Sequence, residues 1–180
     1  MARLTARKSA RRAAGPVVLR AGRLTDVAAL HAIEARAFTY DRLSGRSFAR
    51  FLRSSGASLI VAEADRVVFA YALTLFRKRS RLARLYSIAV DPTVFRRKVG
   101  SRLLKAAEAA AFRRRAKAMR LEVKAGNRRA LGLYRTFGYR VVEELGAYYN
   151  DGGKALRLEK AFVGFQQSAV RFPLGPKNEV

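Results

Sequence analysis

Cysteine is absent from this 180-residue sequence, and histidine occurs once. Without cysteine there is no disulfide framework, thiolate metal site or cysteine nucleophile, and one histidine excludes a site built from several imidazoles. No apolar run approaches the roughly 18 residues that a membrane-spanning helix needs. The apolar stretch 13–19 is short, contains Gly15 and Pro16, and makes a poor secretory signal. We therefore expect a reduced, cytoplasmic protein without a transmembrane helix.

Acidic residues are scarce, because 13 Asp and Glu stand against 38 Lys and Arg, which gives a formal net charge of +25. The resulting positive field attracts polyanions, so RNA, DNA, a ribosome or a phosphate-rich cofactor are candidate partners. Arg outnumbers Lys, and its planar fork suits phosphate, although codon composition produces the same bias. A solvated basic face with no dedicated partner is the alternative.

Half of the residues are hydrophobic, which is enough for one compact domain and too many for a mainly disordered chain. We expect a flexible basic arm over 1–15, a folded domain over 16–161 and a C-terminal extension over 162–180. The arm carries five cations and no acid. It is interpreted as a disordered tail, a nucleic-acid contact or an organelle transit segment.

Hydrophobic periodicity and turn residues predict the element order βααβββαβαββ, a mixed α/β architecture. Helices are expected after Thr25-Asp26, after Ser44, over about 100–115 and between Asn127 and Gly138. Strands are expected over 17–21, 59–64, 67–76, 82–90, 118–124, 139–145 and 155–161.

A basic loop, Phe95 to Ser101, joins the strand 82–90 to the helix that follows it. The start of a helix offers free backbone N–H groups and the positive end of its dipole to a phosphate. Cations at 96–98 add charge there, and Gly100 permits close approach of a ligand to the backbone. The loop has neither a Walker spacing nor the three glycines of a dinucleotide fingerprint, so a purely structural turn is the alternative.

Three titratable residues are candidates for acid–base chemistry. Glu122 lies in the middle of an apolar strand, either as a surface residue or as a partly buried base suited to proton abstraction. Tyr134 lies on the apolar stripe of the following helix, either as a core residue or as an acid. His31 falls on the apolar face of the first helix and is interpreted as structural, because no Ser or Asp is placed to form a triad with it.

Several of these segments occur together in a recognisable order. They are Ile88-Ala89-Val90-Asp91-Pro92, Val99-Gly100-Ser101, Leu103-Leu104, Leu121-Glu122-Val123, Asn127, Ala130, Leu133-Tyr134 and Phe137-Gly138-Tyr139. Over about 17–161 the sequence resembles the GNAT superfamily of acyl-CoA-dependent N-acetyltransferases. Within it, Leu121-Glu122-Val123, the Asn127 to Tyr134 spacing and Tyr148-Tyr149 resemble the bacterial ribosomal-protein alanine N-acetyltransferases. The resemblance implies a mixed, mainly antiparallel central sheet flanked by helices.

The resemblance also implies an enzyme that uses acetyl-CoA as co-substrate and needs no metal. Tyr134 would protonate the departing CoA thiolate, and Glu122 would take a proton from the amine, through water. Tyr148 and Tyr149 would line the acceptor site. The residues that would bind the cofactor are Ile88, Ala89 and Val90 along the pantetheine arm, Arg96, Arg97, Lys98, Val99, Gly100 and Ser101 around the pyrophosphate, and Asn127 beside the pantetheine.

The phosphate loop departs from the family pattern at two positions. Phe95 stands where a polar residue is usual, and it has no polar head to reach phosphate. Lys98 replaces a glycine, and its side chain either adds a salt bridge to phosphate or crowds it. These departures bear on the affinity for acetyl-CoA and leave open a scaffold that has lost its activity.

We expect transfer to a peptide or protein α-amine. A ribosomal protein is a reasonable acceptor, because a basic enzyme is drawn to RNA-rich particles. A small-molecule amine is the nearest alternative acceptor. A non-catalytic RNA- or ribosome-binding module on the same scaffold is the alternative from another class of function.

Overall fold

The computed structural model describes residues 15–94, 98–149 and 152–162. A 3-10 turn, η1 (Leu24–Asp26), precedes the first α-helix. The helices are α1 (Val27–Ala37), α2 (Gly45–Arg53), α3 (Val99–Arg113) and α4 (Arg128–Thr136). The strands are β1 (Val18–Ala21), β2 (Ala57–Ala64), β3 (Val67–Phe76), β4 (Leu82–Val90), β5 (Ala118–Lys124), β6 (Arg140–Leu145) and β7 (Ala155–Ala161). The predicted element order is confirmed, with η1 added.

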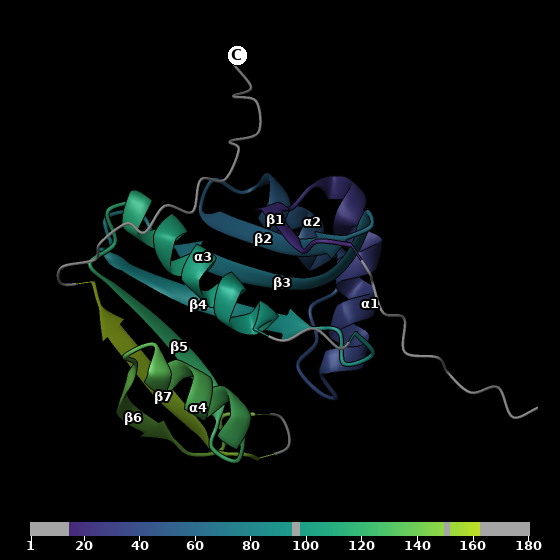
Figure 1. The fold of residues 1–180 in the computed structure, drawn as a ribbon. Helices are drawn as coiled ribbons and strands as arrows, with labels where there is room; N and C mark the ends of the chain where they lie inside the picture. Colours follow the sequence, from purple (N-terminus) through teal and green to yellow (C-terminus); the bar gives the residue numbers. More distant parts are fainter. Residues whose placement is uncertain (1–14, 95–97, 150–151, 163–180) are drawn as a thin grey trace, which may run out of the picture.

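One seven-stranded sheet runs through the molecule in the order β1-β2-β3-β4-β5-β7-β6 (Figure 1). Every neighbouring pair is antiparallel except β4 and β5, which are parallel because α3 connects them as a crossover. The expected mixed, mainly antiparallel sheet flanked by helices is thus confirmed. The order of the last three strands places β7 between β5 and β6.

Helices cover both faces of the sheet and enclose two apolar clusters (Figure 1). The larger cluster lies under α3 and α4 and contains Leu103, Leu121 and Tyr134. The smaller cluster lies under α1 and α2 and contains Leu30 and Phe48. Side chains alternate between the two faces along each strand, so β5 directs Leu121 and Val123 to the α3 side and Glu122 to the opposite side.

Local turn and cap signals in the sequence are correct at several element ends. Ser44 caps α2 by accepting a hydrogen bond from the Ser47 amide at 3.1 Å. Gly138 follows α4 with φ +86°, a left-handed conformation that glycine adopts without steric cost. The β2–β3 hairpin turns through Asp65 and Arg66 with φ of 53° and 62°, both left-handed, as a two-residue hairpin requires.

Two expectations on α1 need correction. Asp26 occupies the N-cap position but forms no cap hydrogen bond to the helix, because its carboxylate accepts from Arg20 at 2.7 and 2.9 Å and from the Arg23 amide. His31 is exposed rather than on the buried stripe, which is formed by Leu30, Ile33 and Glu34. Apolar periodicity thus located the buried face through Leu30 and Ile33, but it did not indicate that Glu34 lies on this face and His31 does not.

Ordered packing continues to the end of the described residues. The Phe162 amide donates to the Lys117 carbonyl at 2.7 Å and the Phe162 ring packs on Phe112, so packing continues to residue 162. The rest of the expected extension, and nearly all of the expected basic arm, lie outside the described residues. Over the described residues, no helix is long and apolar enough to cross a bilayer.

Candidate active site

The strands β4 and β5 pair over only three residues each and then diverge. Leu82 to Arg84 are in register with Ala118 to Arg120, and beyond this point the two strands separate. In Figure 1 the strands open away from their shared start toward the end where β4 stops. Ile88–Val90 therefore pair with β3 on one edge and present their other edge to the opening. An unpaired strand edge offers backbone N–H and C=O groups to a ligand.

A bulge in β4 stands at the start of this opening. Leu73 pairs with Ser87 and Thr74 with Leu85, so Tyr86 is an additional residue without a partner on β3. The Tyr86 side chain is exposed. Behind the bulge, the Tyr71 hydroxyl is 2.7 Å from Ser87 Oγ and also bonds to the buried Glu34 carboxylate. Burial raises the pKa of Glu34, although Tyr71 donates a hydrogen bond to it.

The start of α3 lies next to the end of β4. Lys98 occupies the N-cap position with φ 62°, the left-handed region that favours glycine. A Cβ placed on Gly100 would lie 3.7 Å from Leu133 Cδ2, an ordinary van der Waals contact, so this side of the first turn faces α4. The Arg102 amide donates to the Lys98 carbonyl, which leaves the N–H groups of Val99 to Ser101 without a helical acceptor. Arg96 and Arg97 lie outside the described residues.

Asn127 caps α4. Its side-chain oxygen accepts from the Ala130 amide at 3.0 Å, and its own amide N–H donates to the Lys124 carbonyl at 2.8 Å. The predicted N-cap is therefore confirmed. The side-chain NH2 group takes no part in the cap, so it can still donate to a ligand at the exposed end of the helix.

Tyr134 lies on the buried side of α4, with 5% of its surface exposed. Its ring makes an edge contact with Tyr139 at 5.7 Å between centroids. Burial raises the pKa of Tyr134 to about 12, with a smaller contribution from Tyr149. The phenol therefore keeps its proton at neutral pH and has the protonation state that a general acid needs.

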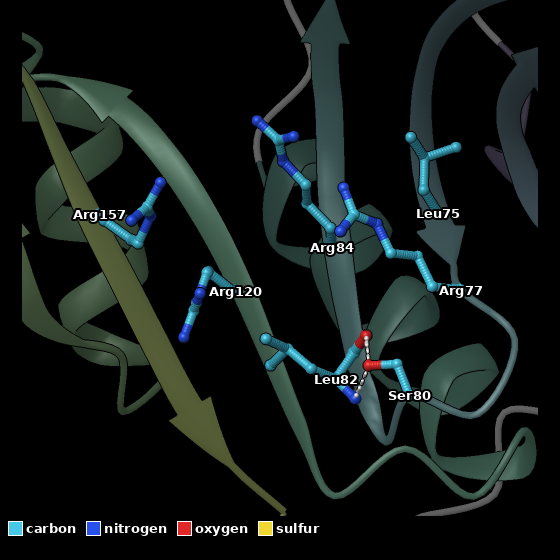
Figure 2. A pocket seen from close by; sticks show the side chains of 7 residues that line it. All are labelled: Leu75, Arg77, Ser80, Leu82, Arg84, Arg120 and Arg157. Atoms are coloured by element: carbon cyan, nitrogen blue, oxygen red, sulfur yellow. Dashed lines mark hydrogen bonds between the residues drawn. The ribbon is translucent and has the colours of Figure 1, made fainter. Parts of the chain in front are cut away.

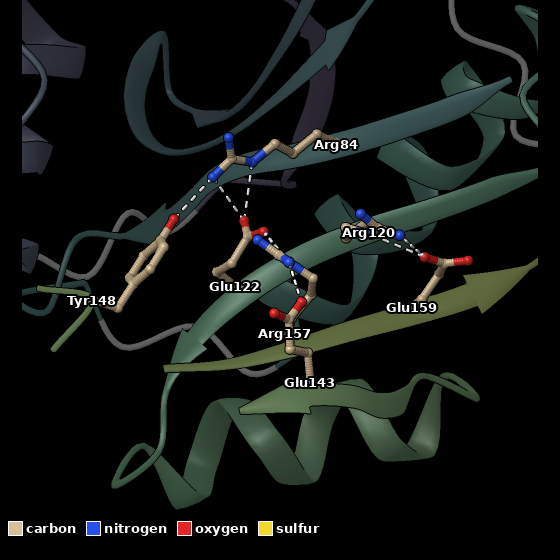
Figure 3. Close-up of polar contacts among 7 residues, drawn as sticks. All are labelled: Arg84, Arg120, Glu122, Glu143, Tyr148, Arg157 and Glu159. Atoms are coloured by element: carbon tan, nitrogen blue, oxygen red, sulfur yellow. Dashed lines mark hydrogen bonds and ion pairs between the residues drawn. The ribbon is translucent and has the colours of Figure 1, made fainter. Parts of the chain in front are cut away.

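Glu122 faces the opposite side of β5, where both of its carboxylate oxygens are bonded to arginines (Figure 3). Arg84 donates from Nε to Oε2 at 3.0 Å, and Arg157 donates from Nε to Oε1 at 3.0 Å. Only 7% of the Glu122 side chain is exposed, so the interpretation as a surface residue is wrong. Arg84 Nη2 also lies 2.8 Å from Oε2, so the second acceptor position of Oε1 is the one that remains for a water or an amine.

The late loop brings its tyrosines to this side of the sheet. The Tyr148 hydroxyl accepts from Arg84 at 3.0 Å, which links the loop to Glu122 through one guanidinium group (Figure 3). Tyr148 is 40% exposed, and its ring makes an edge contact with Tyr149. Both amides donate to the Gly153 carbonyl, so the loop closes tightly on itself.

A recess continues from this cluster toward the start of β4 (Figure 2). It is lined by Leu75, Arg77, Ser80, Leu82, Arg84, Arg120 and Arg157. Its walls come from β3, β4, β5 and β7 and are mostly guanidinium groups. Arg120 is held by Glu159 at 2.8 Å, whereas Arg77 forms no ion pair with another described residue.

Comparison with known proteins identifies the family of this fold. The sequence profile of the acetyltransferase (GNAT) family matches residues 27–139, which is more than half of the chain. The chain belongs to the GNAT acetyltransferase family. This membership confirms the predicted enzyme class, an N-acetyltransferase that uses acetyl-CoA.

Solved structures agree with this assignment. The acetyltransferase is similar to the ribosomal-protein-S18-alanine N-acetyltransferase of Escherichia coli, with 25% identity, a TM-score of 0.74, and coverage of 86% of this chain and 99% of that one. Ard1 of Thermoplasma volcanium shares 25% identity with a TM-score of 0.73, and 81% and 97% of the two chains are covered. The ribosomal-protein-alanine N-acetyltransferase of Brucella melitensis shares the fold at 21% identity and a TM-score of 0.71, over 80% and 99% of the two chains. No curated protein sequence matches the chain significantly.

Among the predicted site residues of the acetyltransferase, Ile88, Val90, Val99 and Tyr134 pack in one cluster, and Glu122 and Tyr148 share Arg84 on the opposite face. Sequence reasoning missed Arg84 and Arg157, the two partners of Glu122. Alternation along β4 and β7 places each of them on the same face as Glu122, but nothing local indicates which strands become neighbours. It also missed Glu34, which is a polar residue within an apolar helical stripe.

Proposed function

We propose that this acetyltransferase transfers the acetyl group of acetyl-CoA directly to the α-amine at the N-terminus of a peptide or protein. The observation that carries the proposal is the opening between β4 and β5, which has Tyr134 on one face of the sheet and Glu122 on the other. A donor entering from the α3 face and an acceptor entering from the opposite face would meet at this opening. With no cysteine in the sequence, the chain lacks a thiol for an acyl-enzyme, which favours direct transfer.

The cofactor site proposed from the sequence is supported by the backbone. The free edge of Ile88–Val90 suits the amide groups of a pantetheine arm, and the Asn127 side-chain NH2 is available at the N-terminus of α4. The first turn of α3, with its N–H groups free of helical acceptors and Lys98 at its cap, suits a pyrophosphate, and Arg96 and Arg97 add charge in sequence. Replacing Arg96 and Arg97 by Ala should weaken acetyl-CoA binding in calorimetry and lower its salt dependence. Unchanged affinity would place the phosphates elsewhere.

We propose that Glu122 is the base and Tyr134 the acid, on opposite faces of the sheet. The bound thioester supplies an activated acyl carbon. Glu122 takes the proton of the attacking amine through a water, as the C–N bond forms and the C–S bond breaks. Tyr134 then gives its proton to the departing thiolate, which its raised pKa permits because the phenol is protonated at neutral pH. The Arg84 and Arg157 guanidinium groups fix the Glu122 carboxylate for this exchange.

An N-terminal amine is favoured as acceptor by the shape and charge of the acceptor face. Over β5 and β7 this face carries no helix, so a chain end could lie along it beside Tyr148 and Tyr149 (Figure 1). The arginine-lined recess would repel polycationic small amines. A ribosomal protein is the acceptor class we propose, supported by the Escherichia coli neighbour that acts on ribosomal protein S18. This target and the lack of a candidate transmembrane helix among the described residues fit a cytoplasmic location.

Two alternatives make different predictions. A small-molecule acetyltransferase would modify free amines in preference to peptides. A non-catalytic RNA- or ribosome-binding module is favoured by one observation, the strained Lys98 at the position where the family has glycine. The deciding experiment is mass spectrometry after incubation with acetyl-CoA and a library of peptides with free N-termini. Peptides acetylated at the α-amine would support the proposal. An enzyme that acetylates small-molecule amines but no peptide, or that gives no product at all, would contradict it.

A further inference from the structure

Two loops at one end of the sheet carry a dense group of exposed cations. The β3–β4 turn spans 77–81, and the last residue of α3 with the α3–β5 connection spans 113–117; neither segment contains an acidic residue. We call their eight cations the basic cap: Arg77, Lys78, Arg79, Arg81, Arg113, Arg114, Arg115 and Lys117. All eight are exposed. Within the described ranges, none of them forms an ion pair with a carboxylate.

The two loops form one surface because their backbones are bonded to each other. The Lys117 and Ala118 amides both donate to the Arg81 carbonyl, at 2.7 and 3.4 Å, where β4 and β5 begin side by side. Each loop is also ordered internally, since the Ser80 amide donates to the Arg77 carbonyl and the Arg115 amide to the Phe112 carbonyl. The cap is therefore a fixed feature of the fold.

Among the eight cations, Arg114 packs against the body of the domain. Its guanidinium group lies 4.4 Å from the Phe76 ring centroid and donates to the Ser55 carbonyl at 2.6 Å. Cations at 113–115 gain some stabilisation from the negative end of the α3 dipole. The β3–β4 turn is at no helix end, so the dipole does not explain its four cations. Their presence beside Lys117 and Arg115 instead suits an external polyanion.

The composition of the cap selects the kind of polyanion. The exposed large hydrophobic side chains of the described residues lie outside both loops, so the cap has nothing to insert into a lipid surface. It has no aromatic residue, and the neighbouring Phe76 ring is covered by Arg114, so it has no platform for stacking unpaired bases. Arginine and lysine without stacking or apolar groups match the phosphate backbones of a double helix.

We propose that the basic cap binds double-helical RNA through its phosphates, without reading the base sequence. The choice of RNA over DNA rests on the proposed function, because an enzyme that modifies ribosomal proteins works beside folded RNA. The cap lies at the C-terminal end of α3, about 22 Å from the Lys98 end on the helical rise of its 15 residues (Figure 1). RNA held there leaves the expected pyrophosphate site and the sheet opening accessible.

The experiment compares two variants of the full chain that lose the same charge. The cap variant carries Lys78→Gln, Arg79→Gln, Arg115→Gln and Lys117→Gln. The control variant carries Arg46→Gln, Arg66→Gln, Arg135→Gln and Arg140→Gln, four exposed cations on other surfaces. Binding to a labelled RNA duplex is measured by fluorescence anisotropy over a range of salt concentrations, with a DNA duplex and phosphatidylserine vesicles as parallel probes. Both variants keep the N-terminal arm, so its contribution cancels.

The cap variant should bind the RNA duplex about tenfold or more weakly at moderate salt than the control variant. Its slope of log affinity against log salt should be flatter by about 2 to 4, roughly 1 for each phosphate that the variant no longer neutralises. Replacing the same four positions by the other cation, Lys for Arg and Arg for Lys, should retain binding. Equal losses in the two variants would overturn the proposal, as would cap-dependent binding that is tighter to DNA or to vesicles than to RNA.

Folding and activity are checked separately from RNA binding. Acetyl-CoA affinity and turnover on a short peptide should be the same in the cap variant and the control variant, because the four residues replaced in the cap variant do not line the recess or the sheet opening. If peptide turnover is absent in every version while cap-dependent RNA binding persists, the proposed function fails and the cap proposal stands. If turnover is present and RNA binding does not depend on the cap, the cap proposal fails and the proposed function stands.

Discussion

Glu122 and Arg157 are register partners on neighbouring antiparallel strands, and their side chains meet across them with Arg157 Nε 3.0 Å from Glu122 Oε1. The pairing fixes the carboxylate at the side of the opening that we assign to the acceptor. Arg157 also bonds to Glu143 on β6, so the same guanidinium links three strands. Glu122 is thus the innermost member of a network that spans the uncovered face of the sheet (Figure 3).

Glu122→Gln should lower kcat by about 10²- to 10⁴-fold, because the amide cannot accept the proton of the amine. The loss should be greatest at low pH, where more of the acceptor is an ammonium ion, and acetyl-CoA affinity should change little. Steady-state kinetics over pH measure this effect. Glu159→Gln is the matched control, since it removes a carboxylate paired with Arg120 on the same face. A Glu122→Gln enzyme with ordinary turnover at every pH would show that this glutamate is structural.

Tyr134→Phe should lower kcat by roughly 10- to 10⁴-fold, through loss of the proton donated to the thiolate. Burial raises the pKa of Tyr134 to about 12, so in the unmodified enzyme this phenol should cause no alkaline decline in kcat below about pH 11. Tyr139→Phe removes a neighbouring buried hydroxyl and serves as control. Equal effects of the two substitutions on turnover would assign Tyr134 to the core alone.

Lys98→Gly should raise the melting temperature of the cofactor-free protein by about 2–4 °C. The left-handed conformation at φ 62° costs a residue with a Cβ about 1 kcal/mol, and glycine avoids this cost. Lys98→Ala removes the same charge and keeps the Cβ, so it should show no such gain. Thermal unfolding followed by circular dichroism compares the two variants. Equal melting temperatures for them would mean that the conformation of residue 98 carries no strain.

Asp91→Asn should lower the free energy of unfolding at neutral pH by about 1–3 kcal/mol. Burial alone would raise the pKa of Asp91, but hydrogen bonds from Arg36 and Thr93 outweigh it and hold the pKa below its usual 3.8. The ionised group therefore stabilises the fold above about pH 3.8, and this contribution disappears as the pH falls toward the lower folded-state pKa.

Urea unfolding at several pH values tests whether the stability contributed by Asp91 is lost as the pH falls. The difference between the unmodified protein and Asp91→Asn should shrink below about pH 4, where the aspartate of the unfolded chain is already protonated. Asp65→Asn, at an exposed carboxylate that accepts from the Gly15 amide, is the control and should have a small effect. A difference that stays constant with pH would assign the effect of Asp91→Asn to packing.

The sequence was sufficient wherever a local signal decides the structure. Ser44 and Asn127 are caps because a short polar side chain reaches the amide three residues ahead, and both are read from neighbouring residues. The β2–β3 hairpin and the strand 82–90 follow from alternation and turns. The order and approximate bounds of the elements were therefore predictable.

The environment of Glu122 was not predictable, because it depends on two non-local pairings. Arg84 reaches Glu122 only after α3 returns the chain beside β4, and Arg157 only after β7 enters next to β5. No spacing in the sequence indicates that β7 pairs on both of its edges. The burial of Glu34 was likewise not predictable, because its partners, the Tyr71 hydroxyl and the Leu43 amide, lie outside α1.

The position of β7 between β5 and β6 sets an order for assembly during synthesis. The strands β1 to β4 are neighbours in chain order and can pair as each one leaves the ribosome, whereas β6 is made before the strand that it pairs with. Until residues 155–161 emerge, Arg157 is missing from beside Glu122 and the Tyr148 loop has no far strand to anchor it. The nascent enzyme thus can pair β1 to β4 first, whereas the network around Glu122 and the Leu158 part of the core under α3 form only after β7 has been translated.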